Sequence, residues 1–131
     1  MYNGIFDWNN KNSITELQRF INATQQTQQS YSLRAHFSLL ATALENIQPT
    51  SYPIGALIFI SDTSDSALQG ADQIFSRLGN VKITFVLLGQ GLDQSKLTQF
   101  SNNFINWTDL SQPQPPGWNN DVAAASYGCK L

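Results

Sequence analysis

One short segment constrains the fold of this chain more than any other. Residues Ala56 to Ile60 are apolar at every position, and Pro53 and Gly55 lie just before them. The run has the length of a strand, and a strand that is apolar on both sides needs cover on both faces, as in a parallel sheet. We therefore expect a central strand of a parallel α/β sheet here.

The residues that follow predict the rest of a β-α-β unit. Apolar side chains recur at helical spacing from Leu68 to Leu78, and Gly79 ends the pattern. Residues Val81 to Leu88 first alternate between apolar and polar side chains and then become wholly apolar, which indicates a second strand. Two strands joined in this way run parallel, with a right-handed connection.

Another strand and two more helices are predicted on the N-terminal side. Tyr2 to Asp7 has the composition of a short strand. A capping box at Ser13 to Glu16 starts a helix that fades by about Gln26. Apolar spacing predicts a further helix from Phe37 to Gln48, because Pro49 cannot continue it.

The C-terminal part of the chain changes in composition. Asp93 is expected to cap a short helix, and Phe104-Ile105 to form an edge strand. From Ser111 onward proline and glycine accumulate, which is typical of a linker. The sequence thus predicts one domain over residues 1–110 and a Pro-rich tail over residues 111–131.

Composition excludes several classes of function. The chain has 131 residues, enough for one domain whose core needs no disulfide. A net charge of −2 with scattered basic residues provides no basic stripe for nucleic acid. The longest apolar run is far shorter than the roughly 18 to 20 residues of a membrane span. The first residues also lack the apolar stretch of a secretory signal.

Three residues bear on the cellular compartment. Cys129 is the one cysteine, so we expect neither an internal disulfide nor a zinc site. Asn22 and Asn106 begin glycosylation sequons, which matter only if the chain is secreted. We expect Asn22, near the polar end of a helix, to carry glycan more readily than Asn106, at a sheet edge.

The most pointed motif is a D-x-S-x-S string at Asp62 to Ser66, between a predicted strand and a predicted helix. Ligands bind at such strand ends in open α/β sheets. Carboxylate and hydroxyl oxygens suit Mg²⁺ or Ca²⁺, which makes Asp62, Ser64 and Ser66 candidate ligands. Equally, Ser64 or Asp65 can cap the helix while Asp62 interacts with its positive end. Taken alone, the motif favours the cap.

Other motifs carry less information. Gly89-Gln90-Gly91 lacks the third glycine of a dinucleotide-binding turn. His36 is the only histidine and has no triad partners, so we expect it at a helix start or on the surface. Trp8, Trp107 and Trp118 lie beside predicted loops, where covering the rim of a small core is favoured over anchoring a partner.

The order of these elements resembles the later part of a von Willebrand factor A-like domain. The resemblance spans residues 2–110 and rests on the strand ending at Asp62, the strand ending at Gly89 and the helix start at Asp93. The segment Phe104 to Leu110 and the Pro-rich run after it are most similar to extracellular domains of nematode proteins that carry a C-type lectin module. The resemblance implies a three-layer, doubly wound, mostly parallel sheet of the Rossmann-like α/β class, without the family's first two strands.

The family holds a divalent ion, and the resemblance implies a degenerate form of that site. Asp62 matches an Asp after the family's fourth strand, although Thr63 replaces the usual Gly. Ser38 is a loose match to a Thr in the family's middle loop. The family's own D-x-S-x-S string follows its first strand, whereas here the string follows a later one. We therefore expect no firmly held cofactor and only weak Mg²⁺ or Ca²⁺ binding.

Two functions from different classes follow. The favoured one is a non-catalytic adhesion or recognition domain, extracellular by resemblance, that binds a protein or carbohydrate ligand. The alternative is a small Mg²⁺-dependent phosphoryl-transfer or hydrolytic enzyme in which Asp62 and Asp65 hold the ion. Such an enzyme would need a second carboxylate cluster, a base or a phosphate-binding Lys at a strand end, and the sequence offers no clear one.

The missing strands also predict how well the chain holds together. Tyr2 to Asp7 would be an edge strand without its family neighbours, and Ala56 to Ile60 would expose an unpaired edge. We therefore expect the 131 residues to be marginally stable, to pair Tyr2 to Asp7 with the central strand, or to associate.

Overall fold

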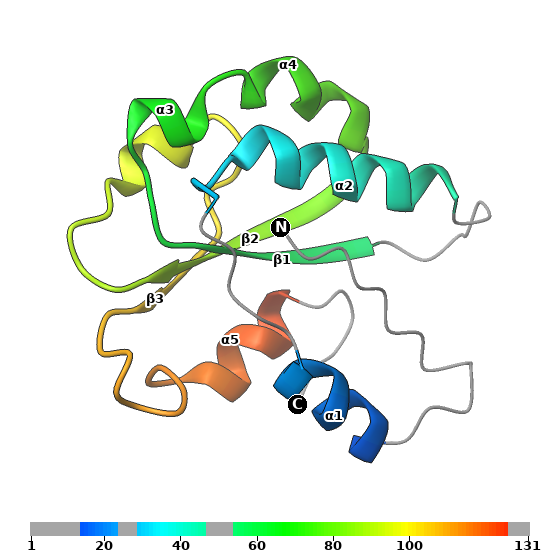
Figure 1. The fold of residues 1–131 in the computed structure, drawn as a ribbon. Helices are drawn as coiled ribbons and strands as arrows, with labels where there is room; N and C mark the ends of the chain where they lie inside the picture. Colours follow the sequence, from blue (N-terminus) through cyan, green and yellow to red (C-terminus); the bar gives the residue numbers. More distant parts are fainter. Residues whose placement is uncertain (1–13, 24–28, 47–53, 126–131) are drawn as a thin grey trace. The chain divides into compact units, whose positions relative to one another are not determined.

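The computed structural model describes residues 14–23, 29–46 and 54–125 (Figure 1). The chain divides into two compact units, residues 1–30 and residues 31–131. The predicted strand Tyr2 to Asp7 lies outside the described residues.

The first unit contributes one helix, α1 (Ile14–Ala23), where the capping box predicts it. The capping residue Ser13 itself lies outside the described part of the chain. On the exposed surface of α1, Arg19 and Glu16 form an ion pair at 3.0 Å.

The second unit is built on a three-stranded parallel sheet. Its strands are β1 (Ile54–Ile60), β2 (Val81–Leu88) and β3 (Phe104–Trp107), in the order β1-β2-β3. Ile54 of β1 pairs with Val81 of β2, and the register continues in parallel through Ile60 and Leu87. The predicted mixed α/β fold and its parallel β-α-β unit are confirmed.

The position of β1 differs from the prediction. Among the residues described, β1 pairs only with β2, so β2 and not β1 is the middle strand. The burial of the two strands agrees with this order, because residues 83–87 of β2 are all buried. Leu57 and Phe59 of β1, in contrast, stay exposed on one face of the sheet. An apolar strand was correctly predicted, but its composition does not define its position in the strand order of the sheet.

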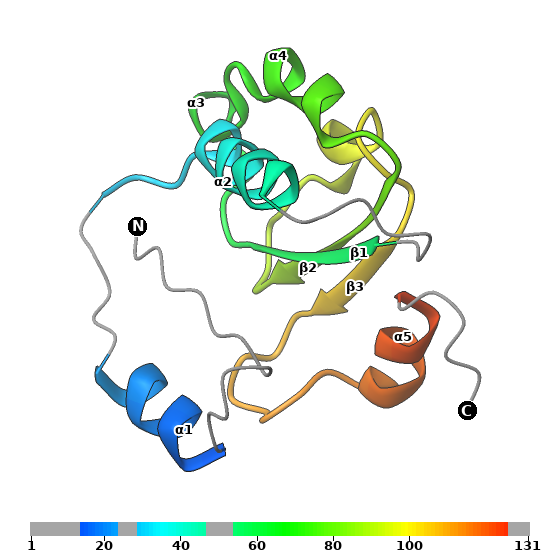
Figure 2. The same cartoon turned by 90° about the vertical axis from the view of Figure 1, so that its right-hand side faces the viewer.

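Helices α2 (Leu33–Glu45), α3 (Asp65–Leu68) and α4 (Ala71–Phe75) cover one face of the sheet, as Figure 2 shows. The main core lies between these helices and the sheet. Its fully buried large side chains include Phe37 from α2 and Phe85 from β2. The rings of Phe37, Phe75 and Phe100 contact one another there, with centroids 5.2 to 5.9 Å apart.

The crossover between β1 and β2 is not the single helix predicted for residues 68–78. Gly70 adopts a left-handed conformation with φ 76°, which ends α3 and lets α4 start in a new direction. A 3₁₀ turn, η2 (Ser76–Leu78), follows α4. Gly79, with φ 63°, ends the connection where the sequence predicts.

Helix α5 (Trp118–Ala125) lies on the opposite face of the sheet (Figure 2). The centroid of the Trp118 ring lies 6.4 Å from that of Phe59 and 6.1 Å from that of Trp107. The two tryptophans thus cover part of this face together. The Pro-rich composition of residues 111–131 predicts a tail and gives no sign of α5. This helix packs through contacts with a distant strand, because the last turn of α5, at buried Ala125, lies against Gly55 of β1.

The remaining boundaries shift by a few residues. Ser32 caps α2 by accepting a hydrogen bond from the Ala35 backbone at 3.2 Å, so this helix starts four residues before Phe37. The predicted short helix is η3 (Gln94–Leu97), a 3₁₀ turn with Asp93 as its cap. No helix in the described ranges is long and apolar enough to cross a membrane.

Candidate functional site

The loops after the three strands form what we call the carboxyl edge, residues 61–66, 89–97 and 108–111. Because the strands are parallel, their carboxyl ends meet at one edge of the sheet, at the left of Figure 1 below α3. This is where open α/β sheets bind ligands.

Each strand is followed by a turn of the form Asp-x-Ser. The carboxylates of Asp62, Asp93 and Asp109 each accept a hydrogen bond from the backbone N–H two residues later. These bonds measure 2.8 Å at Ser64, 3.0 Å at Ser95 and 3.0 Å at Ser111. The sequence analysis singled out only the first of these three turns.

The first two loops of the carboxyl edge are fastened to each other. Buried Thr63 accepts a hydrogen bond on Oγ1 from the Asp93 backbone at 2.8 Å. Lys96 Nζ donates to Asp65 Oδ1, also at 2.8 Å. The two contacts hold the loop after β1 against the loop after β2.

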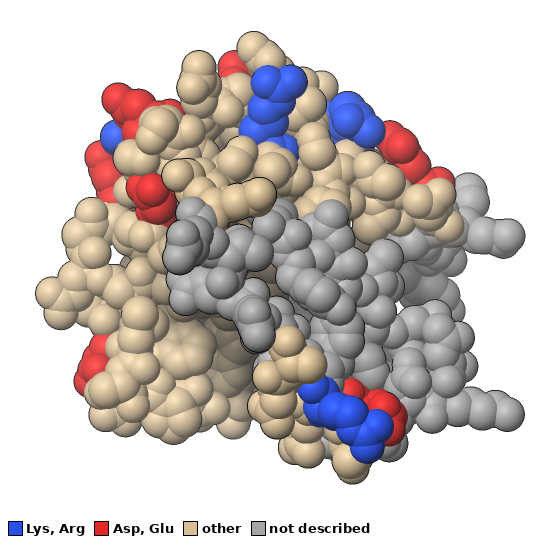
Figure 3. All heavy atoms as spheres, in the orientation of Figure 1, with Lys and Arg blue, Asp and Glu red and all other residues tan. Residues whose placement is uncertain are grey.

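The Asp-x-Ser turns favour the charged form of the three aspartates at the carboxyl edge. The backbone N–H of Ser64 holds the pKa of Asp62 below its ordinary value. The Ser95 and Ser111 side chains, followed by their backbone N–H groups, lower the pKa of Asp93 and Asp109 in the same way. On the face shown in Figure 3, acidic side chains gather over α3 and the neighbouring loops.

Within the D-x-S-x-S string, the capping interpretation is confirmed for Ser64. Its Oγ accepts from the Ala67 backbone at 3.3 Å, at the start of α3. The same Oγ lies 3.2 Å from the Ser66 hydroxyl. Asp65, whose side chain is 95% exposed, pairs with Lys96. The string thus serves the turn and the helix start.

The four predicted ion ligands lie on two segments: Asp62, Ser64 and Ser66 in the loop after β1 and the start of α3, and Ser38 in α2. Ser38 lies half-buried in the second turn of α2, not in a loop. The Asp65 carboxylate pairs with the Lys96 ammonium at 2.8 Å. In the ranges that the structure covers, no three His, Cys, Asp or Glu side chains come together as metal ligands. Asp62 and Ser64 already accept hydrogen bonds within their own loop, which leaves few free oxygens for Mg²⁺ or Ca²⁺, and weak binding stays a prediction.

Tyr31 and His36 form a pair that the sequence analysis missed. The Tyr31 hydroxyl and His36 Nδ1 share a hydrogen bond of 2.9 Å, with the rings edge to face. Burial lowers the pKa of His36. Burial, and after it the negative charge of Asp62, raise the pKa of Tyr31. His36 is in the first turn of α2, as expected of a helix start.

A sequence signal for this pair does exist. Once Ser32 is known to be the cap, Tyr31 and His36 occupy the two positions whose side chains pack against each other in a hydrophobic staple. The signal was hidden because the predicted helix began too late. Lys96 pairs with Asp65, but nothing in the sequence around Lys96 predicts that contact.

No protein-family model, curated protein or solved structure matches this chain. The case for a function therefore rests on the arrangement of the residues themselves.

The asparagines of both sequons are exposed. Asn22 lies in the last turn of α1, and Asn106 lies in β3. Their order of glycan occupancy stays a prediction.

Proposed function

We propose that this chain is a non-catalytic recognition domain of the von Willebrand A-like kind, extracellular in origin, which binds a protein or carbohydrate ligand through its carboxyl edge. The observation that carries the proposal is the fastening of the first two loops by Thr63 to Asp93 and by Asp65 to Lys96. A polar surface that is ordered before binding loses less conformational entropy when a ligand arrives.

The chemistry of the edge supports recognition more than catalysis. The three Asp carboxylates accept hydrogen bonds from their own turns and have lowered pKa values, so they stay charged and cannot act as general acids at neutral pH. Leu110, 55% exposed, adds an apolar contact between Asp109 and Ser111. Charged acceptors around an apolar side chain suit lysine and arginine side chains or sugar hydroxyls.

An array of immobilised glycans and purified extracellular-matrix proteins tests this proposal. Leu110→Arg places a bulky cation on the carboxyl edge, and Asn80→Arg places the same group on an exposed position at the opposite end of β2. We expect Leu110→Arg to abolish binding and Asn80→Arg to leave it unchanged. Equal binding by both variants and the unmodified chain would remove the carboxyl edge from the proposal.

Metal binding separates this function from the enzyme alternative. We expect calorimetry to detect no submillimolar binding of Mg²⁺, Ca²⁺ or Mn²⁺, because Asp62 and Asp65 are engaged by Ser64 and Lys96. Submillimolar binding that disappears in Asp62→Ala would favour an ion-dependent site, and with it either ion-dependent adhesion or phosphoryl chemistry. Asp72→Ala, at an exposed position of α4, is the matched control.

A further inference from the structure

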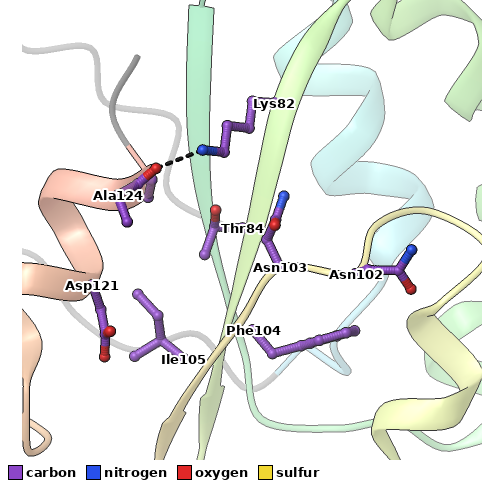
Figure 4. Close-up of a pocket in the computed structure, with 9 residues that line it drawn as sticks. Lys82, Thr84, Asn102, Asn103, Phe104, Ile105, Asp121 and Ala124 are labelled. Atoms are coloured by element: carbon purple, nitrogen blue, oxygen red, sulfur yellow. Dashed lines mark hydrogen bonds between the residues drawn. The ribbon is translucent and has the colours of Figure 1, made fainter. Parts of the chain in front are cut away.

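We infer that a pocket beneath α5 binds a small zwitterion, a molecule with one carboxylate and one ammonium group, such as a free amino acid. The pocket has a volume of about 270 Å³ and lies between α5 and the first half of β2, with the start of β3 along one side (Figure 4). It is separate from the carboxyl edge, because its strand residues belong to the amino-terminal part of the sheet.

The first observation is an unsatisfied hydroxyl in the wall of the pocket. Thr84 is only 3% exposed, and its Oγ1 has no hydrogen-bond partner, alone among the buried side-chain polar atoms of the described residues. Figure 4 shows this oxygen on the side of Thr84 that faces Lys82. Buried hydroxyls are almost always hydrogen-bonded in folded proteins, so a group that can bond here gains more than one on an open surface.

The second observation is the pair of opposite charges at the pocket. Lys82 lies two residues before Thr84 on the same face of β2, and its Nζ donates to the Ala124 carbonyl of α5. Asp121, one turn earlier in α5, brings a carboxylate to the same pocket. Figure 4 shows Lys82 and Asp121 toward opposite ends, with Thr84 and Ile105 between them.

These features together select a class of ligand. A ligand carboxylate can accept from the Lys82 ammonium and the Thr84 hydroxyl, while a ligand ammonium meets the Asp121 carboxylate. A simple anion would meet Asp121 unfavourably, and a simple cation would meet Lys82 unfavourably. The volume lies just below the range of about 300 to 1,000 Å³ that is usual for drug-sized ligands, so the ligand is of fragment size.

The test is a titration of the full ¹⁵N-labelled chain, followed by amide chemical shifts. Glycine, β-alanine and γ-aminobutyrate are the zwitterions, and acetate and methylammonium are probes with one charge each. We expect at least one zwitterion to shift the amides of residues 82–86 and 121–125 saturably. Its Kd should be at least about tenfold lower than that of either singly charged probe.

Three variants assign the contacts. Lys82→Met and Asp121→Asn should each weaken the zwitterion by about tenfold, and Thr84→Val should weaken it by several fold. Arg77→Met and Asp72→Asn remove one charge of each sign elsewhere on the surface and should leave zwitterion binding unchanged. The spectrum of each variant reports in the same experiment whether the chain is still folded.

Two results would overturn the inference. One is equal binding of acetate and glycine with no effect of Asp121→Asn, which would indicate a plain anion contact. The other is the absence of saturable shifts at these amides with any zwitterion at millimolar concentration. Neither result bears on the carboxyl edge, which is tested by different variants and different ligands.

Discussion

At the scale of single residues, the described part of the chain contains two buried threonines in opposite situations. Thr63 and Thr84 are the buried polar residues of the described structure. The hydroxyl of Thr63 accepts a hydrogen bond from the Asp93 backbone, whereas that of Thr84 has no partner. The same substitution at the two positions should therefore change the free energy of unfolding in opposite directions.

Valine has nearly the shape of threonine without the hydroxyl. We expect Thr63→Val to lower the free energy of unfolding by about 1–3 kcal/mol, because it leaves the Asp93 N–H without its acceptor. Thr84→Val should raise it by up to about 1 kcal/mol, since no hydrogen bond is lost. Urea unfolding of both variants measures this. A loss of stability in Thr84→Val would mean that its hydroxyl has a partner in solution.

His36 should make stability depend on pH. Burial lowers its pKa in the folded chain from the ordinary value of 6.5, so the unfolded chain takes up a proton more readily. Stability is then complete above about pH 6.5 and falls as the pH drops from there toward the folded pKa. Urea unfolding between pH 5 and 8 measures the slope, and His36→Gln should flatten it. An unchanged slope in that variant would contradict the assignment, because the chain has no other histidine.

At the scale of elements, the docking of α5 depends on a glycine. A Cβ at Gly55 would lie 2.9 Å from the carbonyl oxygen of Ala125, closer than real Cβ contacts come. That oxygen belongs to backbone and cannot rotate away. The last turn of α5 can therefore approach β1 only where β1 has no side chain.

Gly55→Ala should separate these two elements. Reduced entropy of the unfolded chain would add about 0.4–1 kcal/mol of stability, but overpacking costs about 1–3 kcal/mol, so we expect a net loss of roughly 1 kcal/mol. Tryptophan fluorescence during urea unfolding follows this, since Trp118 lies in α5. In a Trp118→Ala background the effect should shrink, because α5 is already loosened. A stabilised Gly55→Ala variant would contradict the close approach.

The elements also show what a single sequence can reveal. Apolar patterns predicted α1, α2 and β2, because side chains that face a core repeat with the geometry of the element, and a continuous apolar run predicted β1. The pattern could not show that Gly70 would break the crossover helix, since a glycine inside such a pattern is often tolerated. Helix α5 was missed because its contacts, to Phe59 and Trp107, are distant in the chain.

The carboxyl edge was predicted in part for the same physical reason. Parallel strands end at the same edge of a sheet, so the residues that bind ligands are expected in the loops after the strands. The Asp62 to Ser66 string was found on that basis. Which oxygens remain available depends on partners from other loops, such as Lys96 against Asp65 and Asp93 against Thr63. A local motif cannot contain those partners.

At the scale of the whole molecule, we expect chains to associate through one surface, the apolar strand β1. Leu57 is 37% exposed on β1, whose second edge is unpaired among the described residues. Leu39, equally exposed at 37%, lies on α2. An apolar strand with an open edge invites pairing with a second chain, whereas a single leucine on a helix does not.

We therefore expect light scattering to show concentration-dependent association that Leu57→Lys suppresses and Leu39→Lys leaves in place. Charged side chains on edge strands oppose strand-to-strand association. Thermal unfolding is the companion measurement. A monomeric, cooperative transition well above about 60 °C, near the upper end for mesophile domains, would mean that the chain needs no further strands.

The parallel sheet also has a consequence for how the chain is made. Every ladder in it joins residues far apart in the sequence, as Ile54 with Val81 and Phe85 with Phe104. During translation, at about 5–20 residues per second, β1 therefore leaves the ribosome before its partner strand exists. The apolar segment Ala56 to Ile60 must wait for the crossover and β2, and α5 is completed last. Slower synthesis lengthens that wait, so the yield of folded chain should depend on translation speed and chaperone supply as well as on final stability.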